Sequence, residues 1–295
     1  MSKYAINEGL LQQIETLQLM VENPLSGMFG GNHQSKNFGS SCEFADYRDY
    51  IPGDDITKID WRAYARFDHL YLKQFLDERQ VHTRIYIDAS RSMDYGKGYK
   101  AEKALEIAAL FAYLSIVQMD KVSIYYIKDN LVHEVVTNMV GKENYYSNIG
   151  KLNDITFDGD IKMSEAILPT TVGYADGMSI IISDFLTDNG YFEAIDYLVN
   201  KKRDVFCIQI LSKDELRPMV RGKVHFYDSE VSSLEYKKDV QKDIIKAYHE
   251  ALNYITNGLK DFLAARNGLY MQCESDVSIT KLFLDYFVNM GVLKW

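Results

Sequence analysis

The apolar residues of this chain fall into short runs with two different spacings, and each spacing predicts a type of element. Runs in which apolar residues recur every three or four positions predict amphipathic helices, whereas short alternating or continuous apolar runs predict strands. The first spacing is expected to give helices over residues 5–22, 101–119, 144–152, 164–168, 192–200, 240–266 and 279–290. The second is expected to give strands over residues 70–75, 84–87, 122–127, 131–137, 178–185, 205–211, 223–227 and 269–273.

The order of the predicted elements indicates the fold class. From residue 84 onward strands alternate with helices, which is the arrangement of parallel strands joined by right-handed crossovers. The run Met178 to Phe185, MSIIISDF, is almost continuously apolar, as expected of a strand buried on both faces. The helix over residues 101–119 is apolar on nearly every side, as expected of a helix between a sheet and another layer. We therefore predict an α/β fold with a doubly wound, mostly parallel sheet.

The first 79 residues lack this alternation, so we divide the chain in two. Residues 1–79 are assigned to an N-terminal helix and an extension, and residues 80–295 to the α/β domain. Gly, Asn, His and Ser dominate residues 27–41, which predicts an exposed loop. A later Pro-Gly turn is followed by Asp54, which is expected to cap a short helical segment that runs through Trp61.

Aromatic and basic residues interleave in the extension, over residues 43–79. Such interleaving can serve base stacking and phosphate contacts, but between residues 43 and 68 seven acidic residues face four basic ones. The surplus of carboxylates favours an internal network of ion pairs and packed aromatic rings over contact with nucleic acid. A partner-binding surface is the remaining alternative. We expect Trp61 and its aromatic neighbours to be buried and the nearby arginines to be paired with carboxylates.

Composition narrows the function classes. The 295 residues carry a formal net charge of -9, which argues against a general nucleic-acid binder because phosphate neutralisation needs a basic face. The three cysteines, Cys42, Cys207 and Cys273, form no CxxC pair and are expected to be reduced thiols of a cytoplasmic protein. The most apolar stretch, Ile107 to Val117, is too short to span a bilayer, so no transmembrane segment is expected.

Small oxygen-bearing side chains follow the first strand of the α/β domain. Asp88, Ser90 and Ser92 occupy every second position there, and Asp184 comes at the end of the apolar run MSIIISDF. In open α/β sheets, ligands lie outside the carboxyl ends of the strands. Mg²⁺ prefers oxygen ligands and needs only one or two carboxylates. These residues are therefore candidates for a magnesium site, but so short a motif by itself favours the alternative, a polar turn in which Asp or Ser caps the next helix.

Motifs for catalysis are weak by comparison. Gly96, Gly98 and Ala101 spell GxGxxA, but they stand too far from the strand end for a dinucleotide fingerprint and are better explained as a helix-entry loop. A magnesium phosphohydrolase would want a second carboxylate two residues after Asp88, where Ser90 stands. The sequence has no GxxxxGK[ST] loop, GxSxG elbow or HExxH motif. These absences count against a magnesium phosphohydrolase, which stays an alternative beside a binding module and a structural domain with a vestigial site.

Two resemblances to known families add to this interpretation. The segment EFADYRDYIPGDDITKIDWRAYAR, followed by FLDER and IDASRSM, resembles the bacterial domain-of-unknown-function 58 family, and the likeness extends from about Cys42 to the C-terminal helix. Asp88, Ser90, Ser92 and Asp184 resemble the metal-ion-dependent adhesion site (MIDAS) of von Willebrand factor type A domains. The fold that this implies is an N-terminal extension on a von Willebrand factor A-like, Rossmann-like domain.

The resemblance also implies a function and a ligand set. Members are typically encoded beside MoxR-type AAA+ ATPases and are thought to act as their non-enzymatic adaptors, so the expected partner is such an ATPase or a client that offers an Asp or Glu. Many members carry transmembrane helices ahead of the motif, and none is expected in this sequence, which puts a link to the membrane in doubt. The adhesion site usually includes a Thr, but the corresponding stretch, GDIKMS, has none. Either Asp160 substitutes as a ligand for Mg²⁺ or another divalent cation, or the site is incomplete.

Overall fold

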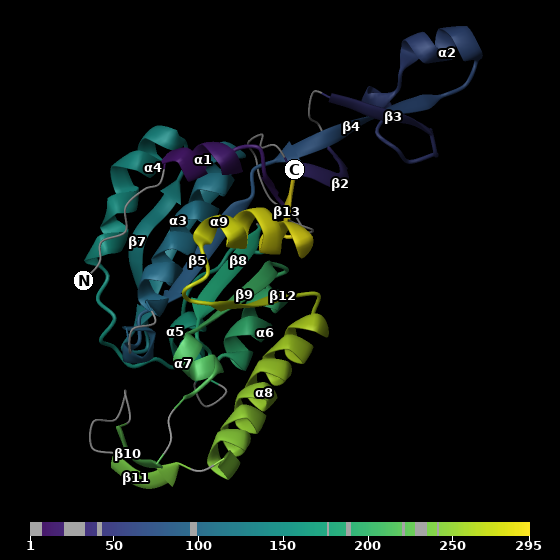
Figure 1. The fold of residues 1–295 in the computed structure, drawn as a ribbon. Coiled ribbons are helices and arrows are strands. Elements are labelled where there is room, and N and C mark those ends of the chain that lie inside the picture. The colour runs from purple at the N-terminus through teal and green to yellow at the C-terminus, as the bar shows by residue number, and fades with distance from the viewer. Residues whose placement is uncertain are drawn as a thin grey trace.

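The body of the molecule is a six-stranded sheet with helices on both faces (Figure 1). The computed structural model describes residues 8–20, 33–39, 43–94, 99–175, 177–186, 190–219, 222–227, 235–240 and 242–295. The strands are β5 (His82–Asp88), β6 (Lys121–Lys128), β7 (Leu131–Met139), β8 (Met178–Ser183), β9 (Asp204–Leu211) and β12 (Leu269–Glu274). They lie in the order β12-β9-β8-β5-β6-β7, and every neighbouring pair is parallel except β6 and β7.

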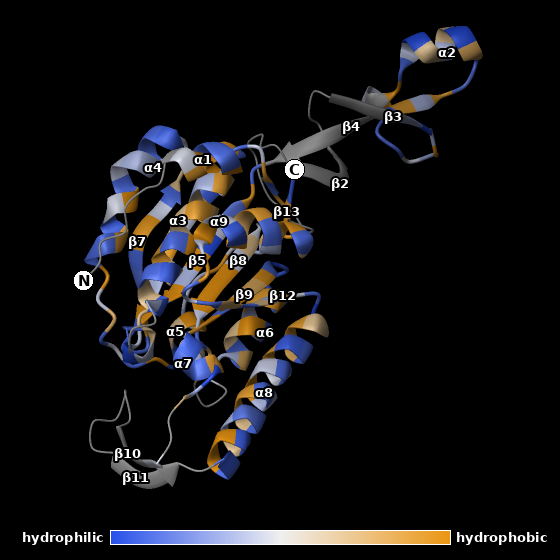
Figure 2. Cartoon of the chain, in the orientation of Figure 1, coloured by the Kyte–Doolittle hydropathy of each residue, from blue (hydrophilic) through white to orange (hydrophobic). Residues whose placement is uncertain are grey.

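Helices cover the two faces of this sheet with separate apolar layers. One layer contains α1 (Glu8–Ile14), α3 (Lys100–Val117), α4 (Lys142–Asn148), α9 (Ile279–Lys281) and the π-helical segment η4 (Leu282–Phe287). The other contains α5 (Met163–Ile167), α6 (Phe192–Asn200) and α8 (Lys242–Ala264). Figure 2 shows the most apolar colours along the central strands, between these layers. The predicted doubly wound, mostly parallel α/β fold is therefore confirmed.

The long helix α3 is buried on nearly all sides, as its apolar sequence predicts. The Phe111 ring lies between the sheet and the outer layer, with ring centroids 5.9 Å from Phe206 of β9 and 5.0 Å from both Phe283 and Phe287 of η4. Because α3 follows β5 in the chain, its first turn lies at the carboxyl edge of the sheet. Within the described residues, no helix combines the length and apolar character needed to cross a membrane.

The N-terminal helix packs on this body and is shorter than predicted. α1 ends at Ile14, whereas the spacing predicts a helix over residues 5–22. The chain turns there because Leu17 and Leu19 are buried in the same apolar layer as α3, and β1 (Gln18–Leu19) pairs antiparallel with β13 (Leu293–Lys294). Strand pairing with the C-terminus therefore overrides the helical period. The division of the chain at residue 79 stays a prediction.

Residues 33–39 and 43–79, termed the arm, form an antiparallel sheet that extends away from the body (Figure 1). Its strands β2 (His33–Gly39), β3 (Glu43–Asp49) and β4 (Tyr71–Arg79) lie in the order β2-β4-β3, and α2 (Trp61–Phe67) lies at the far end. The loop predicted over residues 27–41 is thus wrong for residues 33–39, and the remainder of that range, residues 27–32 and 40–41, lies outside the described residues. The sequence HQSKNFG has no apolar period, so its strand structure comes from pairing with β4.

A short 3₁₀ segment, η1 (Ile56–Lys58), lies in the range predicted to be helical, with Asp55 as its cap, and the α-helix of the arm begins at Trp61. Asp60 caps it by accepting hydrogen bonds from the backbone N–H groups of Arg62 and Ala63, at 2.9 and 3.2 Å. Asp54, the predicted cap, instead accepts a hydrogen bond from a neighbouring backbone N–H and forms a 2.8 Å ion pair with Arg48. The expected pairing of an arginine with a carboxylate is thus found at Arg48.

The aromatic side chains of α2 are exposed, which contradicts the expected burial. The exposed fractions are 59% for Trp61, 40% for Tyr64 and 69% for Phe67. The helix has seven residues and buries only Ala63, because it lies at the far end of a narrow three-stranded sheet, away from the apolar layers of the body. The arm therefore presents these rings to the outside instead of using them as internal support.

The remaining helices and strands lie close to their predicted ranges, apart from the strand predicted over residues 223–227 and the helix predicted over residues 144–152. Asp129 and Asn130 have positive φ angles of 52° and 59°, which fits the predicted hairpin turn between β6 and β7. The predicted edge strand over residues 223–227 does not join the six-stranded sheet. It forms β10 (Gly222–Tyr227), which pairs with β11 (Glu235–Val240) in a separate hairpin. The helix predicted over residues 144–152 divides into α4 and the 3₁₀ segment η3 (Ile149–Asp154).

A glycine ahead of β8 provides a test of this packing. Gly177 has a φ of +137°, and a Cβ there would lie 2.5 Å from Val81 Cγ1 and 2.7 Å from the backbone N and O of His82. Gly177→Ala is expected to lower the free energy of unfolding by about 3 kcal/mol, from backbone strain and overpacking together. Urea denaturation measures this. Gly190→Ala, where nothing lies within 4 Å, is the control and should change it by less than about 0.5 kcal/mol.

Candidate functional site

The predicted ligands from two strands meet at one edge of the sheet. β5 and β8 are hydrogen-bonded neighbours, and Ile87 lies opposite Ile182. The next residues, Asp88 and Ser183, therefore leave the sheet side by side, and the Ser183 hydroxyl donates a hydrogen bond to Asp88 Oδ2 at 2.5 Å. Asp184 follows at the same edge. The sequence-based prediction that the Asp88 loop and Asp184 share the carboxyl edge of the sheet is confirmed by this pairing.

The carboxylate of Asp88 is buried and lacks a cation among the described residues. Its exposed fraction is 1%. One oxygen accepts a hydrogen bond from the backbone N–H of Ser90 at 2.8 Å, and the other from Ser183. Burial, and then the negative charge of Asp184, raises the pKa of Asp88 to about 6. At neutral pH the group is therefore mainly a buried anion held by hydrogen bonds alone.

Two serine hydroxyls lie next to each other in the loop after Asp88. The Oγ atoms of Ser90 and Ser92 are 2.9 Å apart. Ser90 is buried and Ser92 is partly exposed, at the start of the 3₁₀ segment η2 (Arg91–Asp94). The loop is fixed from the other side by Gly159, whose carbonyl accepts a hydrogen bond from the backbone N–H of Arg91 at 3.1 Å. The sequence thus places its two serines on a supported loop, one of them buried and the other partly exposed.

Asp184 is already paired with a buried lysine. The Lys100 ammonium, on the first residue of α3, donates to Asp184 Oδ2 at 2.9 Å and to Glu215 Oε1 at 2.6 Å. The side chains of Lys100 and Asp184 are both fully buried. Burial alone would lower the pKa of Lys100, but the charges of Asp184 and Glu215 outweigh it and raise the pKa. Lys100 is therefore a permanent cation at this site.

Glu215 reaches this lysine from the short helix α7 (Lys213–Leu216). Its second oxygen accepts a 2.6 Å hydrogen bond from the backbone N–H of Ser212, while Ser212 Oγ caps the backbone N–H of Glu215. This capping box fixes the carboxylate in place. The Glu215 side chain thus caps the start of α7 and also neutralises a buried ammonium.

Asp160, the proposed substitute for the usual Thr, directly follows Gly159, whose backbone bonds to the loop after Asp88. Its side chain is exposed and accepts a hydrogen bond from the backbone N–H of Ile161 at 2.8 Å. Its backbone contacts the turn at Asp129, with the Asp129 N–H donating to the Asp160 carbonyl at 2.8 Å. None of its contacts within the described residues involves Asp88 or the two serines. The backbone next to Asp160 thus meets the Asp88 loop, and the role of Asp160 as a ligand stays a prediction.

Three residues of the site escaped the sequence reasoning. Ser183 directly precedes Asp184 at the end of an apolar strand, so its position was a usable signal. Glu215 belongs to an S-x-x-E capping box and is indistinguishable in sequence from any other helix cap. Lys100 begins a helix, where a lysine is normally solvated. Its role depends on contacts 84 and 115 residues away in the chain.

The charge balance of these side chains fits a divalent cation. Lys100 is paired with two carboxylates, Asp184 and Glu215, and the charge of Asp184 also acts on a third, Asp88. These four side chains together have a net charge of -2 and are largely buried. Within the described residues, no three His, Cys, Asp or Glu side chains gather closely enough to hold a metal by themselves. A cation at this edge would therefore depend on the hydroxyls of Ser90 and Ser92 beside Asp88. Hydroxyl and carboxylate oxygens are ligands that Mg²⁺ accepts.

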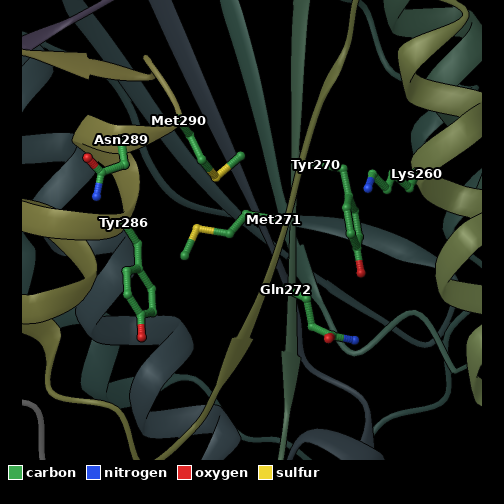
Figure 3. Close-up of a pocket in the computed structure, with 7 residues that line it drawn as sticks. All are labelled: Lys260, Tyr270, Met271, Gln272, Tyr286, Asn289 and Met290. Carbon is green, nitrogen blue, oxygen red and sulfur yellow. The ribbon is translucent and has the colours of Figure 1, made fainter.

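A separate hollow of about 410 Å³ lies along β12, between α8 and the C-terminal segment from η4 to Met290 (Figure 3). It is lined by Lys260, Tyr270, Met271, Gln272, Tyr286, Asn289 and Met290. Figure 3 shows the Met271 and Met290 side chains on one side of the strand and Tyr270 with Lys260 on the other. No carboxylate lines this hollow among the described residues, so it is distinct from the acidic group around Asp88.

Comparison with known proteins places the chain in a family. The family model of the protein of unknown function DUF58 matches residues 46–253, a range that includes most of the arm, the Asp88 loop, Asp184 and Glu215. The chain belongs to the DUF58 family. Uncharacterized proteins of Mycobacterium tuberculosis and Mycobacterium bovis are similar to this DUF58 chain, at 33% identity over 103 residues, or 35% of this chain. The matched region spans 32% of the length of those relatives.

Solved structures that resemble the chain include BatB from Bacteroides thetaiotaomicron and a von Willebrand factor type A protein from Catenulispora acidiphila. BatB is 17% identical, with a TM-score of 0.43, covering 72% of this chain and 98% of BatB. The Catenulispora protein is 12% identical, with a TM-score of 0.38, covering 74% of this chain and 43% of that protein. Both TM-scores are below 0.5, and the α/β assignment rests on the sheet order and crossovers of the DUF58 chain itself.

The buried lysine provides a test of the site's electrostatics. Lys100→Met leaves Asp184 buried without its cation, which is expected to lower the free energy of unfolding by about 3–5 kcal/mol. Lys103→Met is the matched control on the same helix. Its partner Glu106 is 26% exposed, so the expected loss is at most about 1 kcal/mol. Denaturant unfolding in chelator measures both.

A double variant separates charge from packing. Adding Asp184→Asn to Lys100→Met removes the buried anion. The double variant should therefore lose less free energy of unfolding than the sum of the two single losses, by more than about 1 kcal/mol. Equal losses for Lys100→Met and Lys103→Met, or strictly additive losses in the double variant, would contradict the assignment of Lys100 as the internal cation.

Proposed function

We propose that this DUF58 chain is a non-enzymatic protein-interaction module with a divalent-cation site of the MIDAS type. Asp88, Ser90 and Ser92 would hold the cation, with Mg²⁺ as the first candidate. The observation that carries this proposal is the Asp88 carboxylate, which is buried without a cation partner in the described structure, beside two serine hydroxyls 2.9 Å apart. An uncompensated buried anion is costly, and a bound cation would remove that cost.

The roles of the remaining predicted ligands differ. Asp184 contributes its negative charge, but Lys100 already occupies its Oδ2 and the backbone N–H of Leu186 donates to its Oδ1 at 3.1 Å. Asp160 lies outside this group of contacts. When bound, Mg²⁺ would supply a positive centre with several positions filled by water, as is usual for this ion. A carboxylate of a partner can replace such a water, so recognition would select partners with an accessible Asp or Glu.

The partner that we propose is a MoxR-type AAA+ ATPase or a client protein that offers an acidic side chain. Membership of the DUF58 family supports this proposal through the adaptor role that the family resemblance implies. The partly exposed Ser92 supports it because the site needs one open side for a partner's carboxylate to approach.

A structural domain with a vestigial site is the second candidate. Lys100 favours it, because an ammonium that already serves Asp184 reduces the need for a metal. A magnesium phosphohydrolase is less well supported. Both Asp88 oxygens accept hydrogen bonds, the residue is 1% exposed, and Ser90 stands where that chemistry would use a second carboxylate.

Cation binding is tested by calorimetry with Mg²⁺ on the full chain. Asp88→Asn keeps the shape and is expected to weaken binding at least about 10-fold, and to abolish the rise in melting temperature that Mg²⁺ produces. Ser90→Ala should weaken binding in the same direction. Asp94→Asn, an exposed carboxylate in the same loop, is the control and should leave the affinity unchanged. No heat of binding and no thermal shift with the unaltered chain would favour the vestigial site.

Partner association is tested with a purified MoxR-type ATPase encoded beside a DUF58 gene. The unaltered chain should bind it in Mg²⁺ and lose at least about 10-fold in affinity in chelator, because the ion would be the recognition centre. Asp88→Asn should bind equally weakly in both buffers. A metal-centred interface would be excluded if both chains bound the ATPase with the same affinity in both buffers. In a separate phosphatase assay, the enzyme would be favoured if only the unaltered chain in Mg²⁺ released phosphate from a phosphomonoester.

A further inference from the structure

A second surface of the molecule, at the far end of the arm, has the composition of a binding site. It is a groove of about 580 Å³ between α2 and the strands β3 and β4. We term it the arm groove. It is lined by Tyr47, Asp60, Arg62, Ala63, Arg66, Phe67, Tyr71 and Lys73. Figure 1 places α2 away from the six-stranded sheet, so the arm groove is distinct from the Asp88 site.

The one carboxylate in the arm groove is used internally. Asp60 is 6% exposed and caps α2 with one oxygen. Its other oxygen accepts a 2.8 Å hydrogen bond from the Tyr47 hydroxyl and lies 3.2 Å from the Lys73 ammonium. The hydrogen bond from Tyr47, with further bonds from Lys73 and the α2 backbone, lowers the pKa of Asp60 to about 2. Asp60 and Lys73 therefore cancel each other's charge and shape the floor of the groove.

Two arginines in the arm groove remain uncompensated. Arg62 and Arg66 lie four residues apart on α2, which puts them on the same side of the helix. Both are exposed, and neither forms an ion pair within the described residues. With Asp60 balanced by Lys73, the groove has a net charge of +2 in a chain whose formal net charge is -9. The groove is thus a local basic site on an acidic protein.

Exposed aromatic rings adjoin the two arginines. Phe67, 69% exposed, lines the groove, and Trp61 and Tyr64 contact each other edge to face on α2, with centroids 6.3 Å apart. Trp, Tyr and Arg are the residues that most often supply binding energy at protein interfaces. A cluster of exposed large apolar side chains on a seven-residue helix is not explained by the packing of the arm, since only Ala63 is buried.

We propose that the arm groove binds an acidic segment of a partner protein. Two carboxylates of the segment would accept hydrogen bonds from Arg62 and Arg66, whose planar guanidinium groups match carboxylates in a two-pronged geometry. An adjacent apolar side chain of the segment would pack against Phe67 and the neighbouring rings. The proposal is independent of the cation site, because no residue of the arm groove belongs to the Asp88 edge.

The chemistry favours an acidic peptide over nucleic acid. Affinity for nucleic acid grows with the number of phosphates neutralised, and two unpaired arginines neutralise about two. The rest of the chain, with its net charge of -9, would repel a long polyanion. A short segment with two carboxylates and one apolar anchor needs no more than the groove offers.

The test is a selection of random 12-residue peptides displayed on phage against the immobilised full chain, followed by fluorescence anisotropy of the enriched peptides. We expect enriched sequences to combine Asp or Glu with aromatic or aliphatic residues. Their affinity should fall at least about 10-fold in Arg62→Glu/Arg66→Glu and in Phe67→Ala, and should weaken as salt is raised. Asp88→Asn should bind the same peptides with unchanged affinity.

The matched control is Lys242→Glu/Lys246→Glu, which reverses two exposed cations with the same four-residue spacing on α8. It changes the net charge equally and should leave peptide binding within about 2-fold. Melting curves show whether the variants fold. The proposal is overturned if selection enriches no acidic peptide, or if acidic peptides bind the arginine variant as well as the unaltered chain. It is also overturned if a 20-nucleotide single strand binds more tightly than the peptides and competes for the same arginines.

Discussion

The arrangement around the sheet edge depends on one buried ammonium. Lys100 lies between Asp184 and Glu215, and its side chain is fully buried. These two contacts join three elements that are distant in the chain: the start of α3, the end of β8 and the capped turn at α7. Because a buried lysine is tolerated only when paired, the geometry of all three elements is constrained at once. The Asp88 loop therefore lies beside Lys100, Asp184 and Glu215, in which one ammonium balances only one of two carboxylate charges.

This balance suits the proposed recognition site better than a catalytic one. Asp88 is held rigidly by Ser90 and Ser183, and rigid placement of an anion is useful for holding a cation but leaves the carboxylate little freedom to act as a nucleophile or base. The arm places a different chemistry elsewhere, with cationic and aromatic side chains at the end of a narrow sheet. The two proposed sites therefore attract groups in different ways, one through an ion and one through arginine directly.

The sequence predicts the fold well where burial is periodic and predicts the site only in part. The helix Phe192–Asn200 has the predicted bounds because its apolar stripe packs on the sheet, whereas His33–Gly39 is a strand only through pairing with β4. Asp88 and Asp184 were found because each follows an apolar strand. Lys100 was not, since its partners are set by tertiary contacts. The exposure of Trp61 was missed because the prediction counted charges along the segment. Such a count does not show how little surface the segment has to pack against.

The junction between the arm and the body has a mechanical consequence. β4 ends at Arg79 and β5 begins at His82, so the arm continues almost directly into a central strand whose other end carries Asp88. β5 is hydrogen-bonded on both sides, to β6 and to β8. A pull on the arm would therefore load β5 along its length, and the two ladders would resist as a set of bonds in shear rather than opening one at a time. The arm is consequently attached at one of the strongest points of the sheet, and tension on it is directed along the strand that ends at Asp88.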